Sequence, residues 1–251
     1  MQQHVYSKFS SLEKTHWWFV ARRAFIRKVI SYFFQNKQLE FCEIGCGTGG
    51  NLPMLTEFAQ VDAVEMNSEA RNIIMNKNNN PSLLSINEGH LPNNINLKKT
   101  YDGVFSLDVI EHVEDDLSAL QSLKPLIKKD GYLILTVPAY QWLWSEHDVA
   151  NHHYRRYTKA KFEKLIKTAG YEIEYSSYFN TLLFPLAVLS RLFENLFTSK
   201  SKPRENTLNM PSAFTNTIFK RIFSLESCWA GKLKMPFGLS IIVVAKIIKH
   251  N

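Results

Sequence analysis

The chain has 251 residues, 45% of them hydrophobic, which is enough to bury the core of one large α/β domain. Its three cysteines form no Cys-x-x-Cys pair, a composition that suits a reducing cytosol and disfavours a disulfide-rich secreted fold. The net charge of +7 is uneven, because residues 1–38 carry +6, residues 39–198 carry −6 and residues 199–235 carry +5. The basic flanks suit either solvent or an anionic surface such as lipid headgroups, and no RGG-like or zinc-finger pattern indicates a nucleic-acid partner.

The N-terminal sequence lacks the apolar core of a signal peptide. The longest charge-free stretch, residues 175–190, is interrupted by Pro185 and is shorter than the ~20 residues that span a bilayer. We therefore expect a cytoplasmic protein, with peripheral contact at the inner face of the membrane as a second hypothesis. The oligomeric state is left open.

Residues 1–38 are expected to form an N-terminal helical segment. Within this segment, residues 15–34 predict a helix that has Thr15 as its N-cap and packs an apolar stripe onto the domain. The aromatic run at residues 16–19 indicates either core packing or a lid over a ligand.

Residues 39–179 alternate between strand and helix patterns, which predicts a parallel sheet with helices on both of its faces. The expected strands lie near residues 40–44, 61–65, 82–86, 101–107, 131–137 and 171–178, and the expected helices near residues 50–59, 68–77, 114–128 and 158–169.

Residues 180–235 break this alternation and are expected to form a helical insertion before the last strand. Two amphipathic stretches, at residues 182–197 and 218–229, flank a polar linker at residues 199–211. The insertion is expected to fold over the substrate mouth as a lid, with interfacial membrane binding as the second hypothesis. Residues 236–251 are expected to supply a terminal strand that completes the sheet.

A glycine cluster follows the first predicted strand, in the run Glu43-Ile44-Gly45-Cys46-Gly47-Thr48-Gly49-Gly50-Asn51. Glycines let the chain turn sharply and let a ligand touch the backbone, while the helix that opens next aims free N–H groups into the turn. Glu65, twenty residues after Gly45, is placed to accept hydrogen bonds from ribose hydroxyls. This pattern alone is compatible with a nicotinamide cofactor or with any other nucleotide-like cofactor.

Carboxylates in two further segments restrict the choice of cofactor. Glu43 precedes the glycines at the end of a buried strand. A buried carboxylate costs folding free energy unless a cationic ligand or hydrogen bonds pair with it. The run Leu107-Asp108-Val109-Ile110-Glu111-His112-Val113 follows the fourth strand and brings carboxylates to the same edge of the sheet.

These motifs together resemble the class I S-adenosylmethionine-dependent methyltransferases. The run from Glu43 to Gly49 is similar to their motif I, Glu65 to their ribose-binding acid, residues 107–113 to their motif after strand four, and residues 129–138 to their fifth strand. The resemblance implies a Rossmann-like, doubly wound, seven-stranded sheet in which the last strand is antiparallel, S-adenosylmethionine as cofactor, and methyl transfer. One departure is that Asn87 or Glu88 stands where many members have an aspartate that contacts adenine.

The cofactor residues that the resemblance implies are Glu43, Gly45, Cys46, Gly47, Gly49, Asn51, Glu65, Met66, Glu88, Gly89 and Asp108. The loop after the fifth strand is expected to hold the reacting groups, since loops at strand carboxyl ends build the site in this architecture. His147 or His153 is expected to be the general base, with Asp148 orienting one of them, because imidazole titrates closest to neutral pH.

Four further residues of this loop, Tyr140, Trp144, Arg155 and Arg156, are expected to contact the acceptor, the arginines through a carboxylate or phosphate. The structural alternative is that Arg155 braces the loop against Asp108 or Glu111 and that Thr158 caps the next helix. The segment resembles a methyltransferase subgroup linked to glycan or lipid modification, which suggests the class of acceptor.

We expect no metal, because the histidines at positions 147, 152 and 153 match neither an HExxH nor a zinc-finger spacing. His112 is interpreted as a cleft residue or a loop brace. The predicted function is methylation of a hydroxyl on a small-molecule, glycan or lipid-linked acceptor. The alternatives are an NAD-dependent oxidoreductase and a non-catalytic S-adenosylmethionine-binding protein.

Overall fold

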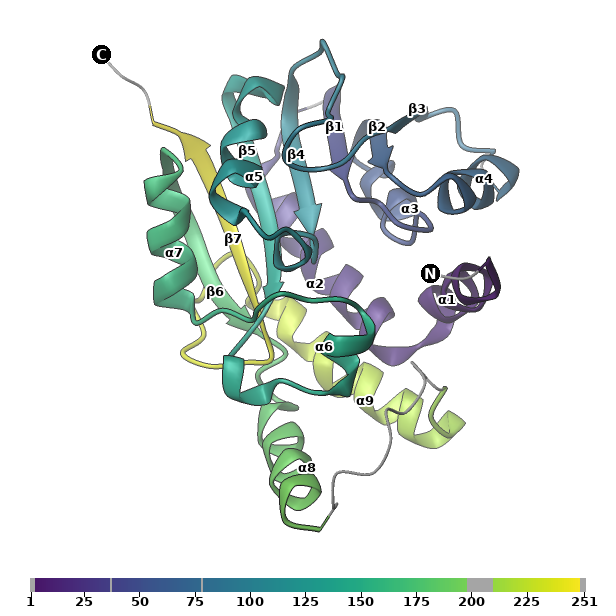
Figure 1. The fold of residues 1–251 in the computed structure, drawn as a ribbon, viewed down its shortest axis with the longest axis vertical. Coiled ribbons are helices and arrows are strands. Elements are labelled where there is room, and N and C mark those ends of the chain that lie inside the picture. Colours follow the sequence, from purple (N-terminus) through teal and green to yellow (C-terminus); the bar gives the residue numbers. More distant parts are fainter. Residues whose placement is uncertain (1–2, 37, 78, 198–209, 249–251) are drawn as a thin grey trace.

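A seven-stranded sheet forms the centre of the molecule (Figure 1). The computed structural model describes residues 3–36, 38–77, 79–197 and 210–248. The strand order is β3-β2-β1-β4-β5-β7-β6, and β7 runs antiparallel to both of its neighbours. The strands are β1 (Leu39–Ile44), β2 (Ala59–Glu65), β3 (Leu83–Glu88), β4 (Tyr101–Leu107), β5 (Ile127–Pro138), β6 (Tyr171–Phe179) and β7 (Ser240–Ile247). The predicted doubly wound fold and its antiparallel last strand are confirmed.

Helices cover both faces of this sheet. They are α1 (Gln3–Thr15), α2 (Trp17–Phe33), α3 (Leu52–Leu55), α4 (Ser68–Lys77), α5 (Asp116–Ser122), α6 (Glu146–Ala150), α7 (Lys159–Thr168), α8 (Phe184–Phe197) and α9 (Ala213–Leu225). Apolar side chains of α2, α3, α4 and α9 pack into one core, and those of α5 and α7 pack into a second core across the sheet. The alternation of side chains along each strand supplies both cores.

The N-terminal region differs from the prediction in two ways. Helix α1 lies within the expected N-terminal helical segment, although no separate helix was predicted before residue 15. Helix α2 begins at Trp17 and has His16 as its N-cap instead of Thr15, because the His16 Nδ1 accepts a hydrogen bond from the Trp18 N–H at 3.3 Å.

Two of the predicted helices are shorter than expected. The segment expected as one helix over residues 114–128 contains α5, a 3₁₀ turn at Lys124–Leu126 and the start of β5. Asp115 caps α5 through a hydrogen bond from the Ser118 N–H at 3.0 Å, and Pro125 falls in the 3₁₀ turn, where its missing N–H is tolerated. Helix α3 has only four residues, since β2 already begins at Ala59 to pair with Leu39 of β1.

The helices expected in the insertion are present, and α9 packs into the core. Asn216 of α9 accepts a hydrogen bond from the Trp17 N–H at 2.8 Å and donates to the Thr15 carbonyl at 3.0 Å. The rings of Trp17 and Phe219 meet edge to face at 5.3 Å. On α8, by contrast, Leu186 and Leu189 are exposed. The linker expected at residues 199–211 falls almost entirely outside the described residues.

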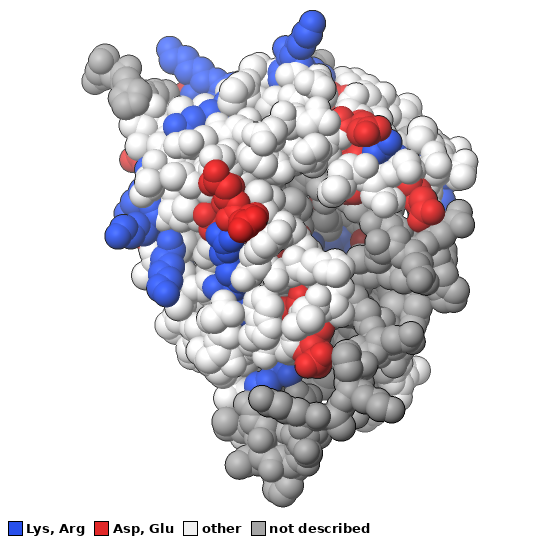
Figure 2. Space-filling model, viewed as in Figure 1, with Lys and Arg blue, Asp and Glu red and all other residues white. Residues whose placement is uncertain are grey.

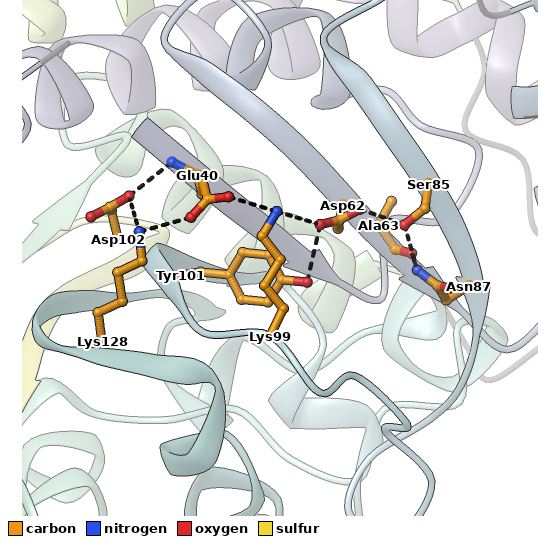
Figure 3. Close-up of polar contacts among 9 residues, drawn as sticks. All are labelled: Glu40, Asp62, Ala63, Ser85, Asn87, Lys99, Tyr101, Asp102 and Lys128. Carbon is orange, nitrogen blue, oxygen red and sulfur yellow. Dashed lines mark hydrogen bonds and ion pairs between the residues drawn. The ribbon is translucent and has the colours of Figure 1, made fainter. Parts of the chain in front are cut away.

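A network of charged side chains joins the amino-terminal halves of the strands (Figure 3). We call it the amino-end network, and it consists of Glu40, Asp62, Lys99, Tyr101, Asp102 and Lys128. Lys128 bridges Glu40 at 2.8 Å and Asp102 at 2.9 Å, and Lys99 bridges Glu40 at 2.8 Å and Asp62 at 3.4 Å. None of the helices that the structure describes is long and apolar enough to cross a membrane.

Candidate active site

The glycine loop after β1 has a backbone that only glycine adopts easily. Gly45, Gly47 and Gly49 have φ angles of 74°, 55° and 81°, in the left-handed region. A Cβ at Gly45 would lie 2.6 Å from the Val109 side chain, whereas a Cβ at Gly47 would meet no described atom within 4 Å. The loop is therefore packed tightly against the segment after β4 on one side and is open to a ligand at Gly47.

Glu65 ties the end of β2 to this loop. Its Oε2 accepts a hydrogen bond from the Gly47 N–H at 2.8 Å, and its Oε1 accepts from the Asn67 N–H at 2.9 Å. The N–H groups of Gly45 and Cys46 donate to the Val64 carbonyl at 2.8 and 3.1 Å. The predicted ribose-binding carboxylate thus lies directly against the glycine loop, and Met66 next to it is exposed.

Glu43 is buried beneath the loop with half of its carboxylate unpaired. Its Oε1 accepts a hydrogen bond from the Asn51 side-chain amide at 2.7 Å, but its Oε2 has no partner in the described part of the chain. Burial raises the pKa of Glu43 to about 8, and the hydrogen bond from Asn51 opposes that rise. A positively charged ligand group could pair with this oxygen. The sequence predicted such a buried carboxylate in need of a partner.

Arg22 of α2 is a buried member of this site that the sequence analysis did not find. Its Nη2 lies 2.7 Å from Asp108 Oδ2 and 2.9 Å from Thr136 Oγ1, and its Nη1 donates to Asn51 at 3.3 Å. Its Nε has no partner among the described residues, and its guanidinium lies 5.2 Å from the Trp18 ring centroid. The signal was present in the sequence, since Arg22 falls one helical turn after Trp18 on the apolar stripe.

The turn after β4 continues the same cluster. Asp108 has a φ of 60° and accepts a hydrogen bond from the Thr136 hydroxyl at 2.9 Å. Glu111 is fully buried, and neither of its carboxylate oxygens has a partner within the described chain. Burial first, and then the nearby Asp108 carboxylate, raise the pKa of Glu111 well above its ordinary value. Partial loss of solvation, reinforced by His153, lowers the pKa of His112 to about 4, although the residue as a whole is exposed.

Asp148 holds together the loop that follows β5. Its carboxylate is fully buried and receives hydrogen bonds from Arg156 at 2.7 and 3.0 Å and from the Ser145 N–H at 2.8 Å, and it lies 2.9 Å from His153 Nδ1. Burial alone would raise the pKa of Asp148, but His153 and Arg156 hold it well below its ordinary value. Among the described side chains of the two predicted bases, that of His153 is paired with Asp148. His147 lies in α6, and its side chain is outside what the structure describes.

The two arginines of this loop are engaged by the protein itself. Arg155 pairs with Asp116 at 2.7 Å and donates to the Glu114 carbonyl at 2.6 Å, so it braces the loop against α5. The bracing alternative named Asp108 or Glu111 and was wrong about the partner. Arg156 pairs with Asp148. Contact of either arginine with an acceptor stays a prediction, whereas Thr158 does cap α7, as its structural alternative stated.

Aromatic side chains border the same loop. Tyr140 has a φ of 59° and stacks on Tyr178 with ring centroids 5.2 Å apart. Trp144 is half-buried, while Trp142, which was not among the predicted contacts, is exposed. The sequence could not distinguish the two tryptophans, because the 3₁₀ turn at Gln141–Leu143 decides which one faces outward.

The two candidates for the adenine contact point in different directions. Asn87 donates to Ser85 Oγ at 2.7 Å, on the side of the amino-end network (Figure 3). Glu88 is paired with Arg71 at 2.7 Å and is largely exposed. A Cβ at Gly89 would lie 2.5 Å from the Asn94 carbonyl oxygen, which explains the glycine at this turn.

Helix α1 closes one side of the glycine loop. The Glu13 carboxylate accepts a hydrogen bond from the Thr48 hydroxyl, and a Cβ at Gly50 would lie 2.5 Å from Glu13 Cδ. Burial raises the pKa of Glu13, although the Thr48 hydroxyl and nearby arginines oppose the rise. Figure 1 shows α1 beyond the ends of α3 and α4, and the face drawn in Figure 2 is hollowed near its centre, with atoms of both charges at the edge of the hollow.

Comparison with known proteins agrees with this geometry. A family model described as a methyltransferase domain matches residues 19–176. No curated protein matches the sequence significantly.

Three solved structures illustrate the likeness of the fold. A protein described as a methyltransferase, from the Haloferax volcanii complex with the Trm112 methyltransferase activator, is similar with a TM-score of 0.64 and 13% identity, over 99% of this chain and 96% of the other. An S-adenosylmethionine-dependent methyltransferase from Clostridium acetobutylicum has a TM-score of 0.60 and 12% identity, over 98% and 100%. An Aquifex aeolicus methyltransferase has a TM-score of 0.52 and 18% identity, over 71% and 93%.

At such identities the structures establish the fold, and the family match adds the activity. The alternatives of an NAD-dependent oxidoreductase and of a non-catalytic binding protein are not favoured. The glycine loop, the acid at the end of β2 and the unpaired buried groups beneath the loop fit S-adenosylmethionine as cofactor. The chain belongs to the methyltransferase-domain family and is a class I S-adenosylmethionine-dependent methyltransferase.

Proposed function

We propose that the enzyme methylates a hydroxyl group of a small-molecule, glycan or lipid-linked acceptor, and that His153 activates this hydroxyl. The observation that carries the proposal is the pairing of His153 with the buried Asp148, 2.9 Å apart. The backbone joins this pair to the turn after β4, since the Tyr154 N–H donates to the Glu111 carbonyl at 2.8 Å. A histidine oriented by a carboxylate is the common arrangement for removing a proton from a weakly acidic hydroxyl.

The cofactor residues are proposed as follows. Arg22 Nε and Glu43 Oε2, which lack described partners, would meet the carboxylate and the ammonium of the methionine part. Glu65 would accept from the ribose hydroxyls, with Gly47 leaving room for the ligand. The remaining predicted contacts are Gly45, Cys46, Gly49, Asn51, Met66, Glu88, Gly89 and Asp108.

S-adenosylmethionine supplies an electrophilic methyl group on a sulfonium, and its leaving group departs neutral. The protein therefore has no leaving group to protonate, and its contribution is to align the acceptor and to activate the nucleophile. Asp148 acts as a positioning residue, because its buried carboxylate fixes the ring of His153 and favours the positive charge that develops on it. Tyr140 and Trp144 are proposed to border the acceptor.

The test uses S-adenosylmethionine with a labelled methyl group and fractionated glycan and lipid acceptors. A labelled methyl ether on the acceptor hydroxyl is the expected result. His153→Gln is expected to lower kcat by about 10²–10⁴-fold with little change in cofactor affinity. Asp148→Asn should lower kcat less and should shift the pH profile. Label on nitrogen or carbon, or an unchanged kcat for His153→Gln, would contradict the proposal.

The lipid-linked class of acceptor draws support from apolar side chains near this loop. Leu182, Leu186 and Leu189 around α8 are exposed, as is Trp142, whose ring lies 6.2 Å from that of Phe184. We propose that this surface contacts the membrane peripherally, from the cytoplasmic side. Co-sedimentation with anionic vesicles that weakens with salt is expected. An absence of co-sedimentation at low salt would instead support the lid hypothesis for α8.

A further inference from the structure

Two loops bring three groups that bind metals to one place. Glu111 and His112 lie in the 3₁₀ turn Ile110–His112 after β4, and His153 lies beyond α6. One donor atom from each residue lies within 4.8 Å of the other two. The rings of His112 and His153 are perpendicular, with centroids 4.5 Å apart. The spacing of the histidines in the second loop does not reveal this combination, because two of its three groups come from the turn after β4.

The carboxylate of Glu111 is the observation that indicates a ligand. It is fully buried, and both of its oxygens lack a hydrogen-bond partner among the described residues. Leaving such a group unpaired costs free energy, and a cation placed between it and the imidazoles would remove that cost. A purely structural carboxylate would instead be expected to have donors within reach.

The imidazole of His153 is oriented as a metal ligand commonly is. Its Nδ1 lies 2.9 Å from Asp148 Oδ1, which assigns Nε2 to the cation. Asp148 is held in turn by Arg156 and Ser145, so the orientation of the ring is fixed by groups behind it. This carboxylate–histidine arrangement recurs behind metal ligands in proteins.

The two loops are also fixed relative to each other. The Tyr154 N–H donates to the Glu111 carbonyl at 2.8 Å, and Arg155 pairs with Asp116 at 2.7 Å. A site whose ligands are fixed in advance loses less conformational entropy when it binds.

We propose that Glu111, His112 and His153 form a binding site for a divalent transition-metal ion. Two imidazoles and one carboxylate suit Zn²⁺, Mn²⁺ or Co²⁺ better than Mg²⁺ or Ca²⁺, which prefer oxygen ligands. Ligands about 2.0–2.2 Å from a metal lie within roughly 4.4 Å of one another, so a small rotation of the exposed His112 would complete the set.

Three protein ligands leave a coordination position open, which an acceptor oxygen would fill. This step rests on the proposed function and would replace proton removal by His153: the metal would lower the pKa of the bound hydroxyl, whose proton would pass to water, while His153 holds the metal. Metal binding itself does not depend on that step.

The test is a Co²⁺ titration of the protein without a histidine tag, followed by visible absorption. The background is Cys228→Ser, because Cys228 is an exposed thiol. One saturable site is expected. His112→Ala and Glu111→Gln should each weaken it at least about tenfold, and Asp148→Asn by about 10–100-fold. The matched control is His152→Asn, which removes an exposed neighbouring imidazole and tolerates the φ of 57° at this position.

Absence of a saturable Co²⁺ signal, or a signal unaffected by His112→Ala and Glu111→Gln, would overturn the site. Should Glu111→Gln fail to fold, the exposed His112 decides the question. Methyl transfer to oxygen that survives loss of the metal would separate this site from catalysis and leave the proposed function standing. Metal binding without any O-methylated product would support the metal site and contradict the proposed function.

Discussion

Two clusters of charged residues lie on the same sheet and are built in opposite ways. In the amino-end network each of the carboxylates Glu40, Asp62 and Asp102 has a lysine partner (Figure 3). At the carboxyl ends of the strands, Glu43 and Glu111 have carboxylate oxygens without partners among the described residues. Arg22 of α2 lies near them, and its Nε also lacks a described partner. We call these three residues, with Asp108, the carboxyl-end cluster.

The two clusters also differ in the direction of their pKa shifts. Hydrogen bonds from Lys128 and Lys99 lower the pKa of Glu40, whereas burial raises the pKa of Glu43 to about 8. Paired charges stabilise a fold modestly, while unpaired buried groups cost stability and are found where a ligand will complete them. We therefore propose that the amino-end network serves stability and that the carboxyl-end cluster serves binding.

The largest effect is expected for Arg22→Ala. The substitution leaves Asp108 without its cation and removes a proposed contact to the cofactor, so it should destabilise the protein by about 3–5 kcal/mol. The affinity for S-adenosylhomocysteine should fall more than about 100-fold. Thermal unfolding and calorimetric titration measure the two effects.

The matched control for Arg22 is Arg27→Ala in the same helix. Arg27 forms a surface pair with Glu57 at 2.6 Å, which is expected to contribute at most about 1 kcal/mol. Equal effects of the two substitutions would break the distinction between a binding cluster and ordinary ion pairs.

Glu43→Gln should weaken binding and yet stabilise the ligand-free protein. Because the folded pKa is about 8 against an ordinary 4.5, the folded state binds more protons between these values and loses stability as pH rises through this window. Glutamine removes that loss, which amounts to at most about 1.4 kcal/mol per pH unit. Affinity for S-adenosylhomocysteine should fall about 10–100-fold. Thermal stability measured from pH 5 to 8 should depend differently on pH in the two proteins. The same pH dependence in both would contradict this account.

Asp62→Asn should lower stability without lowering the affinity for the cofactor, which is the opposite of the result expected for Glu43→Gln. Asp62 is buried and accepts hydrogen bonds from Tyr101 at 3.1 Å and from Ser85, so its loss should cost about 1–3 kcal/mol. The Kd for S-adenosylhomocysteine should not change. A large loss of affinity in a folded variant would show that the amino-end network also serves binding.

Lys128→Met is expected to have the smallest effect, below about 1 kcal/mol, because the lysine is half exposed. The effect should shrink further at high salt. Chemical denaturation at two salt concentrations provides the measurement, and an effect of several kcal/mol would mean that the network is more strongly coupled than its exposure implies.

The sequence predicted the sheet and the glycine loop because both depend on local patterns. Strand and helix periodicities gave the element order, and Glu43, Glu65 and Asp108 follow strands that end at one edge of the sheet. What could not be predicted depends on tertiary packing. The sequence places Arg22 on the apolar stripe, but its contacts with Asp108 and Asn51 require α2 to pack on the loop. The contact of Glu13 with Thr48 likewise requires α1 to pack there.

The reacting groups show the same limit. The sequence placed His112 and His153 in two loops at the same edge, yet nothing in their spacing indicates that their rings meet. The sequence also predicted acceptor contacts for both arginines, with loop bracing as the alternative for Arg155, and it did not identify Asp116 and Asp148 as their partners. Pairing between distant loops is decided by packing, which one sequence does not display.

The most direct test of the central claim is a crystal structure of the complex with S-adenosylhomocysteine. The account predicts that the methionine part gives partners to Arg22 Nε and Glu43 Oε2, and that the ribose hydroxyls bind Glu65 beside Gly47. It also predicts that His153 faces the position of the transferred methyl group. A ligand that leaves Arg22 Nε and Glu43 Oε2 unpaired, or that binds away from the glycine loop, would contradict it.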